Sequence, residues 1–311
     1  MQKQLWEDPK VIKINKEDGH VIAMPFDNVD SAISGEESKY KKSLNGEWKF
    51  YWQRGLENQP QNFEKPEFND KEWDNITVPS VWQTEGYSVP YYYASTFPRA
   101  ISRSKHKIPS IDHKMQEIGF YRKSFTLDDS WKKREIFIHF GAAKAALEVF
   151  VNGTFVGYSQ GSMTPHEFDI SKYVKFGEEN IVCAKVYRYS DGTYLEDQDM
   201  WWLCGIYREV YLFAESPVCL RDFFFRTKLD NYYKDAEIDF DLYINNYAGL
   251  KGNVTAEAHL ISDTGREFPI AEKTVPLGIN KTTISMKSEM KNPKKWSAEH
   301  PNLYTLVITV K

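Results

Sequence analysis

Alternation of apolar and polar residues limits what this chain can fold into more than any other feature of its sequence. Between residues 236 and 245 every second side chain is apolar (Ala, Ile, Phe, Leu, Ile), and the intervening ones are Glu, Asp, Asp, Tyr and Asn. Because successive side chains of a strand point to opposite faces, this segment predicts a strand with one buried face. Residues 254–260 and 304–310 repeat the pattern, and helical periodicity is almost absent. We therefore expect an all-β protein.

A second set of strand-like segments lies upstream and predicts a larger β domain. These segments are residues 48–52, 120–127, 134–140, 147–151, 155–159, 181–189 and 206–213. Asn152-Gly153 between two of them indicates a hairpin, because a type I′ turn needs positive φ at both central positions. The same residues open an Asn-Gly-Thr glycosylation sequence, but the absence of a secretion signal favours the hairpin.

The dipeptide Ser216-Pro217 separates the two sets of strands, and we place the domain boundary there. Residues 1–216 are expected to form an N-terminal arm and a jelly-roll β-sandwich. Residues 217–311, about 95 residues with roughly seven strand-like segments, have the size of an immunoglobulin-like β-sandwich. Within the first domain, the basic and turn-rich segment 99–116 is expected to be a long surface loop.

Charge, cysteine content and motif content exclude several classes of protein. Forty basic and forty-four acidic side chains leave a net charge of −4, so net charge does not favour a nucleic-acid partner. Cys183, Cys204 and Cys219 form no CxxC pair, which argues against a disulfide framework and a thiolate zinc site. The sequence contains no phosphate-binding glycine loop, no HExxH and no GxSxG motif.

Hydropathy favours a cytoplasmic protein without a membrane partner. No apolar run approaches the ~20 residues that are needed to span a bilayer. The N-terminal segment lacks the apolar core of a signal peptide and carries acidic residues throughout.

The densest cluster of candidate binding residues lies in the irregular segment 189–208, which follows a predicted strand. The candidates among its acidic and aromatic side chains are Asp191, Tyr194, Glu196, Asp197, Asp199, Trp201 and Trp202. Carboxylates accept hydrogen bonds from sugar hydroxyls, and indole rings stack on the apolar faces of pyranoses. Loops on a rigid sandwich often carry binding residues. The same side chains could instead cap turns, pair with arginine or fill the core, and composition alone favours that structural role.

A second candidate is the segment 78–83 together with the tyrosine-rich segment 91–97. Three consecutive tyrosines would place at least one phenol on each face of an extended segment, although composition favours a half-buried edge strand. Glycoside hydrolysis needs two carboxyl groups that flank one bond, and no local pattern singles out such a pair among the forty-four acidic residues.

Six motifs occur in order along the chain and together resemble a known enzyme family. They are WEDP (6–9), SLNGEWKF (43–50), VPSVWQ (78–83), SDGTYLEDQDMW (190–201), GIYR (205–208) and NPKKWSAEHPNLY (292–304). In these motifs the chain resembles the N-terminal part of the large bacterial β-galactosidases of glycoside hydrolase family two. The resemblance covers essentially all 311 residues, and family members are much longer, so the chain resembles a truncated piece with the first two domains.

The resemblance implies a galactose-binding-like jelly roll, then an immunoglobulin-like sandwich, and then a (β/α)₈ barrel that these residues do not include. In this family both catalytic glutamates lie on the barrel and hydrolyse terminal β-D-galactosides such as lactose by a retaining mechanism. The resemblance therefore assigns no catalytic residue to this chain, and the chain alone is expected to be inactive.

The resemblance also implies site residues and metal ions. Asp191 matches the aspartate that contacts galactose hydroxyls and helps to hold a sodium ion. Ala94 stands where the family has a galactose-contacting asparagine. Either Ser95 substitutes for it, or the contact is absent and the substrate preference differs. Asp8 stands where the family has an asparagine in the arm that touches the magnesium region, so it is a weaker candidate ligand. Sodium and magnesium are thus the implied cofactors of the full-length enzyme.

The implied partners are a β-galactoside substrate, the catalytic barrel and further copies of the same chain in a homo-oligomer. β-Glucuronidases and β-mannosidases share the domain order, but the extended SDGTYLEDQDMW match argues against both. A different class of function also fits the residues, namely a stand-alone carbohydrate-binding module with an immunoglobulin-like spacer.

Overall fold

The computed structural model describes residues 4–93, 98, 101 and 107–311. Nearly all regular structure in these ranges is β, as the alternating pattern predicts, with short α-helices at Val29–Ile33 (α1) and Thr193–Glu196 (α2). Single 3₁₀ turns occur at Leu5–Glu7, Trp82–Thr84 and Asp129–Trp131. None of the described helices is long and apolar enough to cross a membrane.

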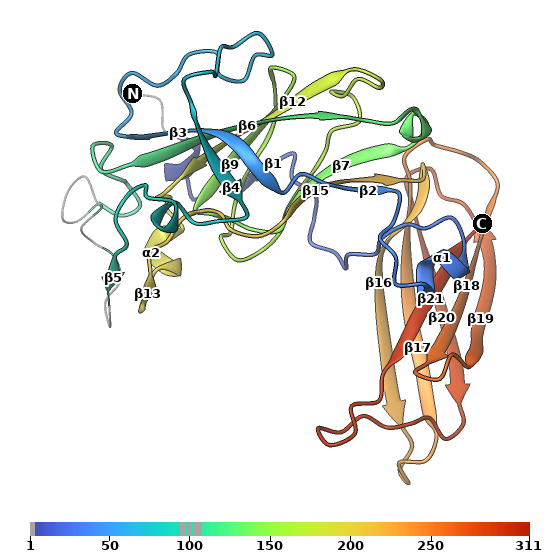
Figure 1. Ribbon diagram of the computed structural model, residues 1–311. Helices are drawn as coiled ribbons and strands as arrows, with labels where there is room; N and C mark the ends of the chain where they lie inside the picture. The colour runs from blue at the N-terminus through green and yellow to red at the C-terminus, as the bar shows by residue number, and fades with distance from the viewer. Residues whose placement is uncertain (1–3, 94–97, 99–100, 102–106) are drawn as a thin grey trace. The chain divides into compact units, whose positions relative to one another are not determined.

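Contacts divide the chain into two compact units (Figure 1). Unit 1 comprises Met1–Asp18, Lys42–Lys132 and Ile136–Phe213. Unit 2 comprises Gly19–Lys41, Lys133–Glu135 and Ala214–Lys311. The sequence predicts a single domain boundary near Ser216-Pro217. In the structure, residues 19–41 belong to the same unit as the C-terminal strands.

Unit 1 is built on two sheets, which confirms the predicted jelly-roll sandwich. In spatial order the larger sheet contains β1 (Lys13–Ile14), β10 (Thr154–Gln160), β9 (Ala146–Val151), β12 (Glu179–Tyr187), β6 (Glu117–Thr126), β3 (Gly46–Arg54) and β4 (Asp74–Val78). The smaller sheet contains β11 (His166–Asp169), β7 (Glu135–Phe140), β15 (Val210–Glu215) and β2 (Lys41–Ser43). Unit 1 also contains two two-stranded ribbons. One pairs β5 (Tyr92–Tyr93) with β13 (Met200–Trp201), and the other pairs β8 (Ala143–Lys144) with β14 (Gly205–Ile206).

The Asn152-Gly153 hairpin joins β9 to β10 as predicted. Both residues have positive φ, 50° and 81°, and the strands pair with Thr154 opposite Val151. The Asn152 side chain also accepts a hydrogen bond from the Ile181 amide of β12 at 2.9 Å. The turn is therefore fixed both by its backbone conformation and by a bond to the neighbouring strand.

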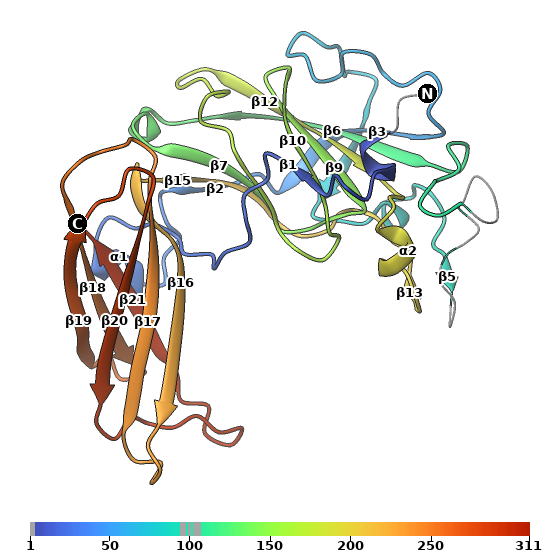
Figure 2. The same ribbon diagram turned by 180° about the vertical axis from the view of Figure 1, so that it is seen from behind.

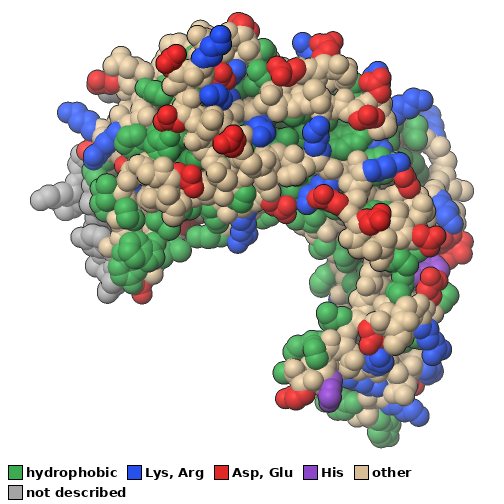
Figure 3. Space-filling view, in the orientation of Figure 1, with side chains coloured by type: hydrophobic (Ala, Val, Ile, Leu, Met, Phe, Trp, Pro, Cys, Tyr) green, Lys and Arg blue, Asp and Glu red, His purple; other side chains and the backbone are tan. Residues whose placement is uncertain are grey.

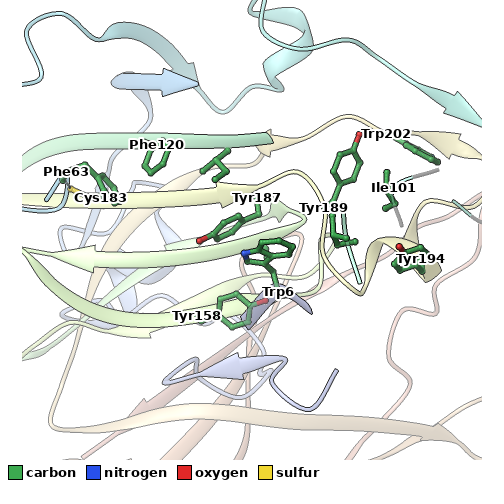
Figure 4. Packing of buried hydrophobic residues seen from close by; sticks show 13 residues of the cluster. Trp6, Phe63, Ile101, Phe120, Tyr158, Cys183, Tyr187, Tyr189, Tyr194 and Trp202 are labelled. Atoms are coloured by element: carbon green, nitrogen blue, oxygen red, sulfur yellow. Dashed lines mark hydrogen bonds between the residues drawn. The ribbon is translucent and has the colours of Figure 1, made fainter. Parts of the chain in front are cut away.

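Buried aromatic and aliphatic side chains lie against the larger sheet and form the core beneath the candidate loop (Figure 4). Two of them, Ile101 and Ile111, are fully buried, so the expectation that segment 99–116 is a surface loop is wrong for these positions. Gln116, at the end of the same segment, is buried as well. Burial of the two isoleucine side chains removes enough apolar surface from water to hold this part of the segment inward.

Unit 2 contains two three-stranded sheets, which confirms the predicted immunoglobulin-like sandwich. In spatial order they are β16 (Val218–Leu229), β17 (Ala236–Asn246) and β20 (Lys281–Met290), and β19 (Glu267–Pro276), β18 (Asn253–Ser262) and β21 (Tyr304–Val310). The apolar positions of β17 are buried, in agreement with their alternation. The described part of this unit has six strands instead of about seven, because most of them run for 10 to 12 residues.

Candidate functional site

The loop that follows β12 begins at a tightly held main chain. The Tyr189 amide donates to Gln116 Oε1 at 3.0 Å, and Gln116 Nε2 donates back to the Tyr189 carbonyl at 2.8 Å. The next residue, Ser190, exchanges bonds of 3.0 Å with the hydroxyl and amide of Thr193. These bonds fold the start of the loop into a turn that leads directly into α2.

Asp191 lies in this turn and is half-buried. Its amide donates to the carbonyl of Trp6 at 2.8 Å, and its Oδ1 accepts a hydrogen bond of 2.7 Å from Gln160 Nε2. Gln160 Nε2 also donates to the Tyr158 hydroxyl at 2.7 Å. Burial raises the pKa of Tyr158, so this hydroxyl stays protonated at neutral pH. Main chain and carboxylate of Asp191 are thus both held, while the side chain keeps access to solvent.

The other two acids near α2 are used inside the protein. Asp197 is 1% exposed and forms an ion pair with Lys144, and its second oxygen has no hydrogen-bond partner among the described residues. Burial raises the pKa of Asp197, and the ammonium group of Lys144 acts in the opposite direction. Glu196 accepts hydrogen bonds from the hydroxyl and amide of Ser162. Asp197 and Glu196 therefore stabilise the loop.

Of the three aromatic candidates Tyr194, Trp201 and Trp202, two are buried and one is exposed. Tyr194 is buried and donates to the Ser110 carbonyl at 2.7 Å, and Trp202 is buried with its Nε1 donating to the Asp197 carbonyl at 2.9 Å. Trp201 is 57% exposed. The predicted cluster is thus largely structural, and Trp201 is the aromatic candidate that is exposed to solvent.

Trp201 pairs with Tyr92 on the β5–β13 ribbon. Tyr92 is 50% exposed, its ring centroid lies 5.4 Å from that of Trp201, and its hydroxyl donates to Asp199 Oδ1 at 2.8 Å. This bond to Asp199 raises the pKa of Tyr92. The ribbon lies beside α2 at one end of unit 1 in both views (Figures 1 and 2), and hydrophobic side chains gather at that end in Figure 3.

Arg188 is a residue that the sequence reasoning missed. It is 1% exposed, and its Nη1 donates to both oxygens of Glu117 at 3.0 Å. Its Nη2 donates to the carbonyls of Val89 at 2.7 Å and Trp202 at 3.1 Å. Arg188 lies just after β12 and bonds the segment that precedes β5 and the segment that follows β13. It therefore holds the β5–β13 ribbon on the sandwich.

The second candidate segment is mainly structural. Trp82 is fully buried, and its indole N–H donates to the Tyr121 hydroxyl. Gln83 Oε1 accepts a hydrogen bond from the Cys204 amide at 3.2 Å. Ser95, the predicted galactose contact, and Ala94 lie outside the described residues.

The described residues hold no cluster of the acidic, histidine and cysteine side chains that commonly bind metal ions. Asp8 is half-buried, and its Oδ1 accepts from the Lys10 amide at 3.3 Å, which closes a turn in the N-terminal segment. Over residues 4–93 and 107–311, with positions 98 and 101, no group of three or more His, Cys, Asp or Glu side chains could hold a metal ion. Asp191 and Asp8 could each supply carboxylate oxygen to a hard cation such as sodium or magnesium.

Asp191 has a half-buried carboxylate that Gln160 holds, and such a carboxylate is able to accept hydrogen bonds from hydroxyl groups. Gln160 holds the Asp191 carboxylate and Gln116 holds the main chain at Tyr189. The sequence did not point to either glutamine. Gln160 ends β10 and Gln116 directly precedes β6, and no local sequence signal links either residue to Asp191.

Family models match two consecutive parts of the chain. The model for the sugar binding domain of glycosyl hydrolases family 2 matches residues 41–216. A second model, described as glycosyl hydrolases family 2, matches residues 218–311. Together the two matches cover well over half of the chain.

Curated relatives are similar over nearly the whole chain. A β-galactosidase from Priestia megaterium is 38% identical over 308 residues, which are 98% of this chain and 30% of that protein. A β-galactosidase from Streptococcus thermophilus is 33% identical over 304 residues, 97% of this chain and 29% of that protein. The chain thus spans about 30% of the length of these relatives.

Solved structures share the fold. Bacteroides uniformis β-glucuronidase matches with a TM-score of 0.70 at 22% identity, over 87% of this chain and 30% of that chain. A glycosyl hydrolase family 2 member from Bacteroides cellulosilyticus matches with a TM-score of 0.67 at 23% identity, over 88% and 33% of the two chains. At this level of identity the likeness shows a shared fold.

Proposed function

Because family models match both of its sandwiches, the chain belongs to glycoside hydrolase family 2, and on this premise we propose that it is the non-catalytic N-terminal part of a β-galactosidase. In this account the whole enzyme hydrolyses terminal β-D-galactosides such as lactose with retention of configuration. The chain shapes the galactose site through Asp191. A (β/α)₈ barrel beyond these residues supplies the acid/base and the nucleophile.

The observation that carries this proposal is the way Asp191 is held. A half-buried carboxylate with a fixed amide and a fixed Oδ1 presents its acceptor sites in one orientation. Vicinal sugar hydroxyls are donors at fixed spacing, and a preorganised acceptor binds them without an ordering cost. Among the neighbouring acids, Asp197 is buried in an ion pair and Glu196 accepts hydrogen bonds from Ser162.

Sequence similarity supports a galactoside over a glucuronide as the substrate. The Priestia megaterium protein, a β-galactosidase, is 38% identical over almost the whole chain. The β-glucuronidase structure is 22% identical, a level that supports the shared fold and carries no information on substrate.

A substrate panel on the complete enzyme tests the proposal. We expect kcat/KM for 4-nitrophenyl β-D-galactoside to exceed the values for the β-D-glucuronide and β-D-mannoside by at least ~100-fold, because a site that hydrogen-bonds hydroxyls rejects misplaced ones. Proton NMR should show β-galactose as the first product, as retention requires. A higher kcat/KM for the glucuronide, or α-galactose as the first product, would contradict the proposal.

A second function, a stand-alone carbohydrate-binding module, is favoured by one observation. The exposed Tyr92–Trp201 pair beside Asp199 has the chemistry of a sugar-binding surface. The gene downstream of Lys311 and calorimetry with galactosides distinguish the two functions. A stop codon together with saturable binding by this chain would support the module, whereas a barrel-encoding reading frame supports the enzyme.

Metal ions, assembly and location stay predictions of the resemblance. Sodium at Asp191 and magnesium near Asp8 would each need further oxygen ligands, such as main-chain carbonyls, amides or water. Dialysis of the complete enzyme against a chelator, followed by readdition of one ion at a time, tests both. Light scattering of that enzyme tests the predicted homo-oligomer, and cell fractionation tests the cytoplasmic location.

A further inference from the structure

The N-terminal arm, defined here as residues 4–14, bonds through its main chain to the main chain of both Asp191 and Gln160. The Trp6 carbonyl accepts the amide hydrogen of Asp191 at 2.8 Å. Six residues later, the Ile12 carbonyl accepts the amide hydrogen of Gln160 at 3.0 Å. β1 then continues the arm as an edge strand, with Ile14 opposite Tyr158 of β10. The arm therefore bridges the loop that carries Asp191 and the strand that carries its hydrogen-bond donor.

Two buried side chains anchor the arm next to Asp191. Trp6 is 1% exposed and packs between His113, at 5.4 Å between ring centroids, and Tyr187, at 5.5 Å. Figure 4 shows its indole beside Tyr158 and Tyr187 in the core. Glu7 is 4% exposed, with Oε1 accepting from the Ile111 amide at 2.9 Å and Oε2 lying 3.0 Å from His113 Nε2. A buried carboxylate with two partners is costly to release, so it holds the arm down.

We propose that the arm is a positioning element for the galactose site, with Glu7 as the residue that latches it in place. The proposal rests on the proposed function, in which Asp191 contacts galactose. Release of the arm removes the acceptor for the Asp191 amide and the acceptor for the Gln160 amide together. Displacement of a binding group by about 1 Å can reduce turnover by ~100-fold even when the fold persists. Glu7 touches no substrate in this account and acts through Asp191.

Hydrogen–deuterium exchange of the 311-residue chain tests the latch without any enzyme activity. Glu7→Ala should accelerate exchange of the Asp191 amide by at least ~10-fold, because its acceptor lies on the arm. Amides of β9, on the same sheet, should keep their protection. Lys10→Ala, an exposed change on the same arm, is the matched control and should leave the Asp191 amide unchanged. Unchanged exchange at Asp191 in Glu7→Ala would overturn the latch.

A double-mutant cycle on the complete enzyme tests whether the latch acts through Asp191. Glu7→Ala alone should lower kcat/KM for a β-galactoside by ~5- to 50-fold at a temperature where the variant stays folded. In an Asp191→Asn background the same change should have almost no further effect, because both act on one contact. Fully additive losses would overturn the positioning role. If Asp191→Asn itself leaves kcat/KM unchanged, the proposed function fails, while the exchange result still decides the latch.

Glu7→Gln separates the two bonds of the latch. Glutamine keeps an acceptor for the Ile111 amide and loses the negative charge that faces His113. We expect Asp191 exchange and kcat/KM to lie between the values for wild type and Glu7→Ala. If Glu7→Gln lowers the melting temperature and the exchange protection of all amides as much as Glu7→Ala does, Glu7 has a general packing role. That result would contradict the proposal.

Discussion

At the scale of single residues, the ion pair between Asp197 and Lys144 anchors the loop that carries Asp191. Both side chains are at least 96% buried, and the Trp202 indole bonds the Asp197 carbonyl in the same place. Removing one partner of a buried pair leaves an uncompensated charge, which costs more than the pair itself contributes. The pair therefore makes the loop sensitive to single substitutions although it carries no binding role.

Lys144→Met should destabilise unit 1 by ~3–5 kcal/mol. Urea unfolding followed by tryptophan fluorescence measures this, because eight of the nine tryptophans belong to unit 1. The double variant Lys144→Met/Asp197→Leu should recover most of the loss. Lys132→Met, which breaks an exposed pair with Asp129, is the control and should cost less than ~1 kcal/mol. A loss below ~1 kcal/mol for Lys144→Met would show that solvent reaches Asp197.

The sequence identified the segment of the candidate site but could not sort its side chains. Asp191, Asp197 and Asp199 lie within nine residues of one another, yet one is half-buried, one is buried and one is exposed. An irregular loop has no period, so sequence spacing does not predict which way each side chain points. Glu7 and Gln160 reach the site through folding of distant segments, which no local pattern reports.

At the scale of secondary structure elements, His166 of β11 connects the smaller sheet to the larger one. It is fully buried, its Nδ1 lies 2.7 Å from Ser159 Oγ of β10, and its Nε2 lies 3.3 Å from the Ala143 carbonyl. Burial lowers the pKa of His166 to about 3, from an ordinary value near 6.5. Between about pH 3 and pH 6.5 the imidazole is therefore neutral in the folded protein, whereas the unfolded chain would protonate it.

This pKa difference predicts acid destabilisation. The unfolded chain binds a proton at His166 below about pH 6.5 and the folded chain does so only near pH 3, so stability falls as the pH falls through this window. The contribution is ~1.4 kcal/mol per pH unit, or ~2 kcal/mol between pH 6.5 and 5. Urea unfolding of His166→Asn should show a pH dependence weaker by that amount. Equal slopes for variant and wild type would contradict the assignment.

The elements that sequence predicted well are those with a strict period. β17 shows the expected alternation of buried and exposed side chains, and the Asn152-Gly153 turn has the expected positive φ angles. Segment 99–116 was predicted wrongly because two isolated isoleucines, Ile101 and Ile111, create no pattern and are nevertheless buried. Aperiodic segments are held by individual side chains, whose burial depends on the rest of the fold.

At the scale of the whole molecule, the chain is about 30% of the length of its curated β-galactosidase relatives. Its two units are a jelly roll and an immunoglobulin-like sandwich. The proposal assigns catalysis to residues outside them. The purified chain should therefore give no turnover of a chromogenic β-galactoside above a mock preparation. Turnover that persists after removal of host β-galactosidase would show that the catalytic carboxyls lie in this chain.

The central claim, that this chain contributes a galactose contact through Asp191, is tested most directly by kcat/KM of the complete enzyme carrying Asp191→Asn. Hydrogen bonds to a charged group contribute ~1.5–3 kcal/mol, so we predict a loss of roughly 10- to 150-fold at an unchanged melting temperature. Asp199→Asn, which alters an exposed acid of the same loop, should stay within about threefold of wild type. An unchanged kcat/KM for Asp191→Asn with a normal melting temperature would contradict the account.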